Sequence, residues 1–269
     1  MHAGKWAWGA ALVAALVFAS AARAAQPFLI DDGLIDAEGQ LELDVLGTAT
    51  WSSLGKTGVL PSVEVDYGVP GVPRLQLHAR LPFALNQPSG QSLQWGVGDA
   101  EIGAKFRIDP NIDDPKALAV VVEPFVDFPS GDADRGLGTG RTHAFLPVFA
   151  SIQLDSGVKP FGGGGYWINP GPGNKNYWFF GAGASGDVPI GELSFTVGGE
   201  VFHSTPSVDG GKPTTGFDVG GLYNFNDDHH LFFTIGRGLQ NANSTNRLTI
   251  LFGYQGFFGG PEETNEKKE

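Results

Sequence analysis

Along most of the chain, apolar and polar residues alternate with a period of two, and this alternation predicts β-strands. The clearest example is residues 74–83. One face carries Leu75, Leu77, Ala79, Leu81 and Phe83, and the other carries Arg74, Gln76, His78 and Arg80. Residues 99–108 repeat this design, with Glu101, Lys105 and Arg107 on the polar face. Because no segment from Gln40 onward keeps a helical period over three turns, the pattern indicates an all-β fold.

Twelve segments have the length and pattern of strands. They are residues 40–50, 61–67, 74–83, 99–108, 118–128, 142–154, 158–168, 177–185, 193–203, 215–225, 230–236 and 248–258. In residues 158–168 the alternation is weakest, because four consecutive glycines, 162–165, interrupt it. A loop is the alternative interpretation of that segment.

The connections between these segments alternate in length. Short ones are residues 68–73, 109–115, 155–157, 187–191 and 226–228, and longer ones are 51–60, 86–97, 129–141, 169–176, 204–214 and 237–246. Transmembrane barrels have short periplasmic turns and longer outer loops. The sequence therefore predicts a transmembrane antiparallel up-and-down β-barrel of about 12 strands with both termini in the periplasm.

A soluble β-sandwich would show the same alternation, but its polar faces would meet water. Here the apolar faces run for about ten residues, close to the ~9–11 that a tilted strand needs to cross a bilayer. Aromatic side chains also gather at strand ends, as interfacial girdles require. They include Tyr67, Phe106, Phe128, Tyr177, Trp178, Phe225 and Phe258. A basic side chain facing lipid near the midplane costs ~2–4 kcal/mol, so we expect the charged faces to point into the lumen.

The ends of the chain predict export. Lys5, an apolar run over residues 10–19 and the triplet Ala22-Arg23-Ala24 have the form of a signal peptide, residues 1–24, with the mature chain starting at Ala25. We interpret residues 25–39 as a periplasmic N-terminal lead, residues 40–258 as the barrel, and residues 259–269 as a disordered acidic and lysine-rich tail. The expected location is the bacterial outer membrane, with outer-membrane lipids and the barrel-assembly machinery as partners.

Composition excludes several functions. The chain has no cysteine, which removes disulfides and thiolate metal sites from consideration. Its formal net charge of -12 argues against nucleic acid as a partner, because phosphates would be repelled. We expect no cofactor and no metal site.

The inward face of the predicted strands supplies the candidate pore-lining residues. They are Glu42, Asp44, Glu64, Asp66, Arg74, His78, Arg80, Glu101, Lys105, Arg107, Glu123, Phe125, Phe145, Phe149 and Glu200. Acidic strands beside basic ones predict either a constriction with a transverse field, which selects charged or polar solutes, or a salt-bridge lattice that plugs the barrel. Arg80 is expected opposite Glu101.

Other inward positions are aromatic or glycine. Phe125, Phe145, Phe149, Phe202 and Phe232 would form either a track for hydrophobic compounds or packing filler. Inward glycines such as Gly103 and Gly253 favour a hollow lumen. The glycine-rich loop of residues 129–141 has neither a phosphate-loop nor a calcium-loop pattern and is interpreted as a gating or simply solvated loop.

Catalytic constellations are weak. His143 and Ser151 lie eight residues apart on one predicted strand, roughly 26 Å at ~3.3 Å per residue, too far to hydrogen-bond. His203 and Ser204 are adjacent and would face opposite sides. We therefore expect no enzyme, with a lipid-modifying barrel enzyme as the less favoured alternative.

Several segments together resemble one family. They are QPFLIDDGLIDAEGQLELDV, LQLHARLPF, GVGDAEIGAKFRI, VVVEPFVDFPSGD and GRGL. The chain is similar to outer-membrane barrels associated with the meta-pathway of phenol degradation, described as transporters. The resemblance implies a channel that passes small, hydrophobic or aromatic solutes and needs no cofactor. A structural or surface-interaction barrel with a closed lumen is the alternative.

Overall fold

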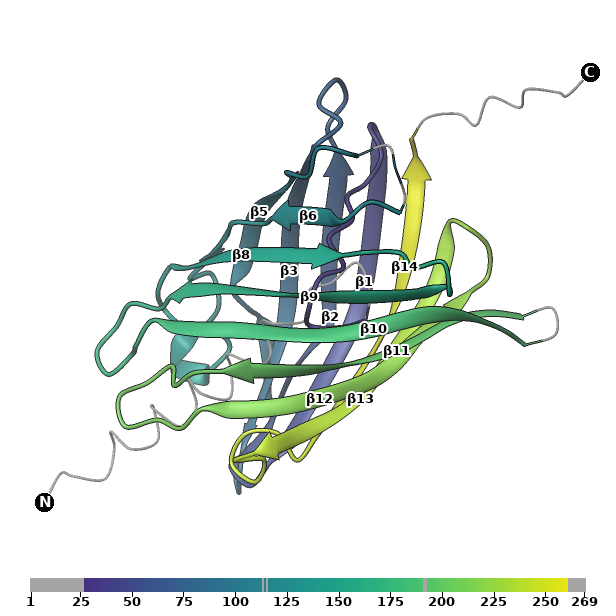
Figure 1. Ribbon diagram of the computed structural model, residues 1–269. Coiled ribbons are helices and arrows are strands. Elements are labelled where there is room, and N and C mark those ends of the chain that lie inside the picture. Colours follow the sequence, from purple (N-terminus) through teal and green to yellow (C-terminus); the bar gives the residue numbers. More distant parts are fainter. Residues whose placement is uncertain (1–26, 113, 115, 191–192, 261–269) are drawn as a thin grey trace, which may run out of the picture.

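The strands of the protein form one closed antiparallel ring. The computed structural model describes residues 27–112, 114, 116–190 and 193–260, so the expected signal peptide, the start at Ala25 and residues 261–269 of the tail lie outside the described residues. Within this part of the chain, fourteen strand segments join into one sheet, and β1 pairs with β14 to close it (Figure 1).

The strand segments follow one another around the ring in chain order, apart from two interrupted strands. The segments are β1 (Gln40–Ser52), β2 (Gly55–Gly68), β3 (Leu75–Pro88), β4 (Gln94–Val97), β5 (Ala100–Arg107), β6 (Ala119–Val122), β7 (Phe125–Phe128), β8 (His143–Ser151), β9 (Val158–Ile168), β10 (Tyr177–Ile190), β11 (Leu193–Ser204), β12 (Thr214–Asn224), β13 (His229–Gln240) and β14 (Leu248–Gly259), with a short 3-10 helix, η1 (Ala133–Arg135).

Two of the strands are interrupted, so the fourteen segments of the described chain occupy twelve positions around the ring. β4 and β5 both pair with β3, and β6 and β7 both lie between β5 and β8. Pro124 breaks the second of these strands, since proline has no backbone N–H to donate to a ladder. The predicted barrel of about twelve strands is therefore confirmed.

The strand bounds differ from the expected ones mainly at the ends. Residues 158–168 form β9 despite their four glycines. Residues 55–60 belong to β2, although the sequence predicts a loop there, because β1 and β2 continue to pair as far as Ser52 and Gly55. We call the end of the barrel that carries the β1–β2 hairpin and residues 129–142 the loop end. The opposite end, where Gln40 and Gly259 lie, is the turn end.

Burial is inverted relative to a water-soluble protein. The outward side chains Leu77 and Ile102 are 48% and 59% exposed, whereas the inward Gln76 and Arg80 are 2% and 4% exposed. An apolar outer surface around a charged interior suits lipid outside and polar groups inside. This arrangement favours the membrane barrel over the sandwich. No helix in the described residues has the length and apolar character needed to cross a membrane.

The segment before β1 lies inside the ring. We call residues 27–39 the lead. Phe28 and Ile30 are 2% and 0% exposed and belong to the main apolar core, and Asp31 and Asp32 are each 1% exposed. The sequence interpretation of a periplasmic segment did not anticipate this position. The physical reason for it is that the charged and aromatic partners of the lead all stand on the inward faces of distant strands.

Candidate functional site

One half of the lumen is lined by charged side chains. Glu42 and Asp44 on β1 stand opposite Asp66 and Glu64 on β2, so four carboxylates form a patch across two strands. The neighbouring strands add His78, Arg80, Glu101, Lys105 and Glu123, which are all buried. The acidic wall and the basic wall that the sequence predicts therefore lie side by side.

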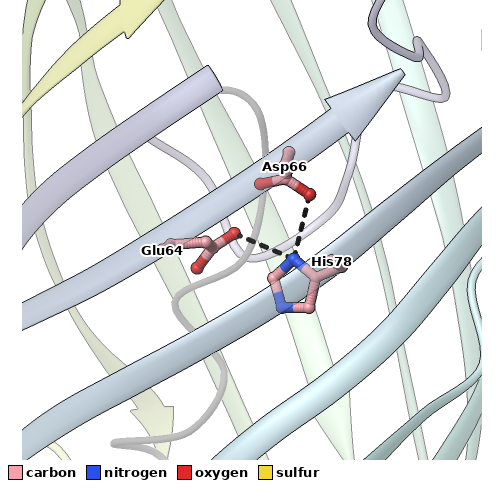
Figure 2. A group of neighbouring side chains, drawn as sticks. All are labelled: Glu64, Asp66 and His78. Atoms are coloured by element: carbon pink, nitrogen blue, oxygen red, sulfur yellow. Dashed lines mark hydrogen bonds and ion pairs between the residues drawn. The ribbon is translucent and has the colours of Figure 1, made fainter. Parts of the chain in front are cut away.

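His78 links carboxylates on both sides of it. Its Nδ1 lies 3.0 Å from Asp66 and 3.6 Å from Glu64 (Figure 2). Its Nε2 lies 2.7 Å from Glu101. Ionised carboxylates accept hydrogen bonds and cannot donate them, so both ring nitrogens need a proton to make these contacts. His78 therefore bridges carboxylates of β2 and β5, and Glu64, Asp66 and His78 are also close enough together to hold a metal ion.

The predicted pairing of Arg80 with Glu101 is confirmed. The two residues are cross-strand partners on β3 and β5, and Arg80 Nη2 donates to Glu101 Oε2 at 2.9 Å. The side chain of Glu101 is fully buried, so this pair is shielded from solvent screening. Glu123 on the interrupted strand lies 3.9 Å from Lys105.

Two of the candidate pore residues lie away from this lattice. Arg74 donates to the carbonyl oxygens of Arg107 and Asp109 in the turn after β5. Arg107 Nε in turn donates to the Asp109 carboxylate at 2.8 Å. Both arginines therefore hold a connection at the turn end together.

The lead is fixed in the lumen by two buried ion pairs. Lys105 Nζ donates to Asp31 at 2.6 Å, and Lys159 Nζ donates to Asp32 at 2.6 Å. Gly33 follows with a φ of 73°, in the left-handed region that glycine adopts most easily, and its N–H donates to Asp31 Oδ1 at 2.6 Å. The Asp-Asp-Gly turn thus presents one carboxylate to each of two lysines.

Glu200 binds the backbone of the lead. Its two carboxylate oxygens accept the N–H groups of Leu29 and Ile30 at 2.6 Å and 3.0 Å. Sequence reasoning named Glu200 as a lumen residue but did not identify this partner, which lies about 170 positions away in the chain. The signal available in the sequence was the Asp31-Asp32 pair in the lead, two adjacent carboxylates beside apolar residues.

The other half of the lumen is aromatic. Phe125, Phe145 and Phe149 join one buried cluster, as do Phe161, Trp167, Tyr177, Phe179 and Phe202. Phe145 and Trp167 stack with ring centroids 4.7 Å apart, and Phe28 of the lead stacks on Phe161 at 5.5 Å. Tyr177, expected at the lipid interface, is instead only 2% exposed inside the barrel.

The inward glycines do not leave empty space. A Cβ at Gly103 would lie 2.7 Å from Cβ of Phe125, and one at Gly253 would lie 2.5 Å from the ring of Phe232. Such distances are too short for real Cβ contacts, so these glycines make room for neighbouring aromatic rings. The expectation that they hollow out the lumen is wrong.

A folded loop covers the loop end of the aromatic half. Leu137 points inward and is 2% exposed. Asp99, in the interruption between β4 and β5, accepts the N–H groups of Gly131 at 2.9 Å and Thr139 at 2.7 Å. The loop of residues 129–142 is therefore packed against the barrel mouth rather than simply solvated.

Cavities lie toward both ends of the barrel. A cavity of about 670 Å³ at the turn end is lined by charged and amide residues that include Asp36, Glu42 and Gln255. A much smaller one, of about 60 Å³, lies beneath Leu137 and is bordered by Arg80, His143 and Trp167. Residues of the lead, including Asp32 and Asp36, themselves line the larger cavity.

The closed twelve-strand ring with an apolar exterior defines a transmembrane barrel of the outer-membrane type. The chain belongs to the family described as "Putative MetA-pathway of phenol degradation", whose sequence profile matches residues 32–250. This finding confirms the resemblance inferred from the sequence segments. No curated protein matches the chain by sequence.

Solved structures support the fold. The COG4313 outer membrane channel from Pseudomonas putida F1 superimposes with a TM-score of 0.60 at 16% identity, over 85% of this chain and 98% of that one. The KdgM porin gives 0.54 at 9% identity, over 81% and 99%. The NanC porin gives 0.54 at 12% identity, over 81% and 100%. These similarities show that the chain has the same barrel architecture as known channels and porins.

Proposed function

We propose that the protein is an outer-membrane channel for small hydrophobic or aromatic solutes and that the structure represents its closed state. The aromatic half of the lumen carries this proposal. A barrel interior that holds only water and ions has no need of stacked rings, whereas an aromatic solute is attracted to them through offset or edge-to-face contacts.

The lead itself illustrates how such a solute would bind. The ring of Phe28 stacks on Phe161 at an interplanar angle of 27°, and Ile30 lies in the same cluster with no exposed surface. Phe28 thus occupies a position where a free aromatic compound of similar size would make the same contacts. In this proposal, passage of a solute requires the lead to leave the aromatic wall.

The structures similar to this one support transport as the function, since their names describe an outer membrane channel and porins. Family membership supports a link to the metabolism of phenolic compounds. By analogy with outer-membrane barrels, we place the turn end in the periplasm and the loop end outside the cell. Outer-membrane lipids and the barrel-assembly machinery are then the partners of the barrel.

A permanently closed barrel is the second candidate, and the ion pairs of the lead favour it. Two buried lysine–aspartate pairs and two amide–carboxylate hydrogen bonds hold the lead in the lumen. Breaking a buried ion pair without replacing either partner costs ~3–5 kcal/mol. A structural barrel would keep these contacts at all times, whereas a channel must exchange them.

Transport measurements on the mature protein in proteoliposomes and planar bilayers distinguish these functions. We expect slow uptake of a small aromatic such as phenol, and faster uptake with higher ion conductance when residues 27–34 are deleted. Phe149→Ala should slow uptake of the aromatic by the deletion variant, because it removes part of the aromatic wall. Arg80→Ala should change its ion selectivity, because it removes a charge from the lumen.

Phe180→Ala is the matched control, since Phe180 is 49% exposed on the outside of β10. It removes the same ring from the lipid-facing surface and should leave uptake unchanged. If the deletion variant neither conducts ions nor takes up the solute, the lumen is closed by the wall itself and the channel proposal fails.

A further inference from the structure

The small cavity at the loop end has apolar walls and one polar edge. The apolar and aromatic side chains that line it include Pro82, Leu137, Trp167 and Tyr177. The polar edge includes Asp127 and His143. Pockets that bind small organic molecules have this composition, with mostly apolar walls and a few polar groups that fix the orientation of the ligand.

Asp127 and His143 are neighbours on the polar edge. They are cross-strand partners on β7 and β8, and they are 5% and 7% exposed. Among the described residues, no group makes a hydrogen bond or an ion pair with the carboxylate of Asp127, and none makes a hydrogen bond with the buried Nε2 of His143. Each of these side chains therefore keeps a hydrogen-bonding atom that the protein itself does not use.

The other polar side chains at this cavity have partners in the wall or in the loop. Arg80 donates to Glu101 at 2.9 Å. Asp99 accepts the N–H of Gly131 at 2.9 Å and the hydroxyl of Thr139 at 2.7 Å. A polar group on a solute in this cavity would therefore find its hydrogen-bond partners in the neighbouring pair described above.

The aromatic rings beside this pair form a stack. Trp167 stacks with Phe145 and with Tyr177, with ring centroids 4.7 Å and 5.8 Å apart and interplanar angles of 19° and 11°. Trp167 and Tyr177 both border the cavity. An aromatic ring in the cavity would extend these contacts in offset or edge-to-face geometry.

The hydrogen-bonding groups favour a hydroxyl substituent on that ring. A hydroxyl group can donate one hydrogen bond and accept another, so it can donate to the carboxylate of Asp127 while its oxygen accepts from the ring nitrogen of His143. A methyl group can do neither. A carboxylate on the solute would meet the like charges of Asp99 and Asp127, which is unfavourable. The cavity therefore suits a neutral phenol better than toluene or benzoate.

We propose that Asp127 and His143 bind the hydroxyl group of a phenolic solute whose ring packs against Trp167 and Tyr177. This rests on the proposed channel function and narrows its substrate class from aromatic compounds in general to hydroxylated ones. The cavity of about 60 Å³ has room for about two water molecules at ~30 Å³ each, whereas benzene occupies an engineered cavity of ~150 Å³. Leu137 must therefore move outward with its loop before the ring enters, which places the site at the loop-end entrance.

Binding of fluorinated solutes at pH 7, measured by ¹⁹F NMR on the mature barrel in nanodiscs, tests this site separately from transport. Empty nanodiscs correct for partition of the solute into lipid. We expect 4-fluorophenol to bind at one site per chain, about tenfold or more tightly than 4-fluorotoluene or 4-fluorobenzoate. His143→Phe keeps an aromatic ring but removes the nitrogen, so it should weaken binding of 4-fluorophenol by about tenfold and leave that of 4-fluorotoluene within about threefold.

Asp127→Leu is the second variant, because leucine has a similar branched shape but accepts no hydrogen bond. It should also weaken binding of 4-fluorophenol by about tenfold, and it tests the site even if His143→Phe fails to assemble. His203→Phe is the matched control. His203 stacks on Phe180 at the outer surface, so its replacement should change binding less than about threefold.

Equal affinity of the wild-type barrel for 4-fluorophenol and 4-fluorotoluene would overturn the proposal, as would equal losses in His143→Phe and His203→Phe. Binding of 4-fluorobenzoate as tight as that of 4-fluorophenol would overturn it too, because Arg80 would then receive the polar group. Selective binding of 4-fluorophenol by a barrel that takes up no solute would uphold the site and reject the channel function. Uptake without selective binding would overturn the site alone.

Discussion

Asp31→Asn tests whether the lead is held in the lumen by its ion pairs. The substitution keeps the shape of the side chain but removes its charge from a contact in which both partners are at least 96% buried. Removing one member of a buried pair costs ~3–5 kcal/mol. Lys105 keeps a second carboxylate, Glu123, at 3.9 Å, so we expect the lower end of that range, about 3 kcal/mol.

That energy falls on docking of the lead, because Asp31 belongs to the lead and its partner Lys105 to the barrel wall. A docking equilibrium weakened by about 3 kcal/mol exposes the lead about 100 times more often. The native chain has no cysteine, so a single cysteine introduced at Leu29 reports this exposure through its rate of reaction with a water-soluble thiol reagent. The labelling rate should rise by the same factor, while the melting temperature of the barrel changes little.

Asp155→Asn is the matched control, because it also removes an aspartate from a lysine pair. That pair, with Lys116, is at the surface, with side chains 87% and 65% exposed, and such pairs contribute ~0–1 kcal/mol. Its labelling rate should stay within a few-fold of the parent. An unchanged rate in Asp31→Asn, or an equal rise in Asp155→Asn, would refute the conclusion that the buried pair holds the lead.

Three further predictions concern export, topology and pH. Mass spectrometry of membrane-extracted protein should find Ala25 at the N-terminus, and an intact Met1 would contradict export through a cleaved signal. A cysteine at Asp132 should react with an impermeant reagent on intact cells and one at Asp228 should not; equal reaction at both would contradict the proposed orientation. Burial opposes ionisation of Asp109, but hydrogen bonds from Arg107 and a backbone amide outweigh it and lower its pKa below the ordinary 3.8. A lowered pKa stabilises the fold above pH ~3.8 and that stabilisation is lost as the pH falls further, so Asp109→Asn should reduce the melting temperature at pH 7 and less so below pH ~4.

The barrel wall could be predicted from the sequence because its determinants are local. The twelve strands follow from alternation within each segment, and the pairing of Arg80 with Glu101 follows from treating neighbouring strands as hairpins. The extension of β2 back to Gly55 was missed because glycine and serine residues there indicate a loop. A Cβ at Gly58 would lie 2.0 Å from the carbonyl oxygen of Thr48, so this glycine is needed for close strand pairing rather than for a turn.

The lumen was harder to predict because its contacts are between distant residues. The lead has no period-two pattern, and its partners Lys105, Lys159 and Glu200 stand on β5, β9 and β11. The alternation of positions along each strand identified which side chains point inward, but it did not show what fills the space between them. The same limit explains the error over Gly103, whose missing side chain makes room for Phe125 on the neighbouring strand.

The pairing of Gln40 with Gly259 places the two ends of the wall one ladder step apart. The wall could therefore be circularly permuted. Joining the end of β14 to the start of β1 and opening the chain in another turn would cost no strand pair. The lead projects from this ring, and residues 27–36 contribute no rung to its ladder. A change in the lead therefore leaves the strand ladder intact, and related barrels with one scaffold can differ in what closes them where the lumen partners of the lead, such as Lys105 and Lys159, change with it.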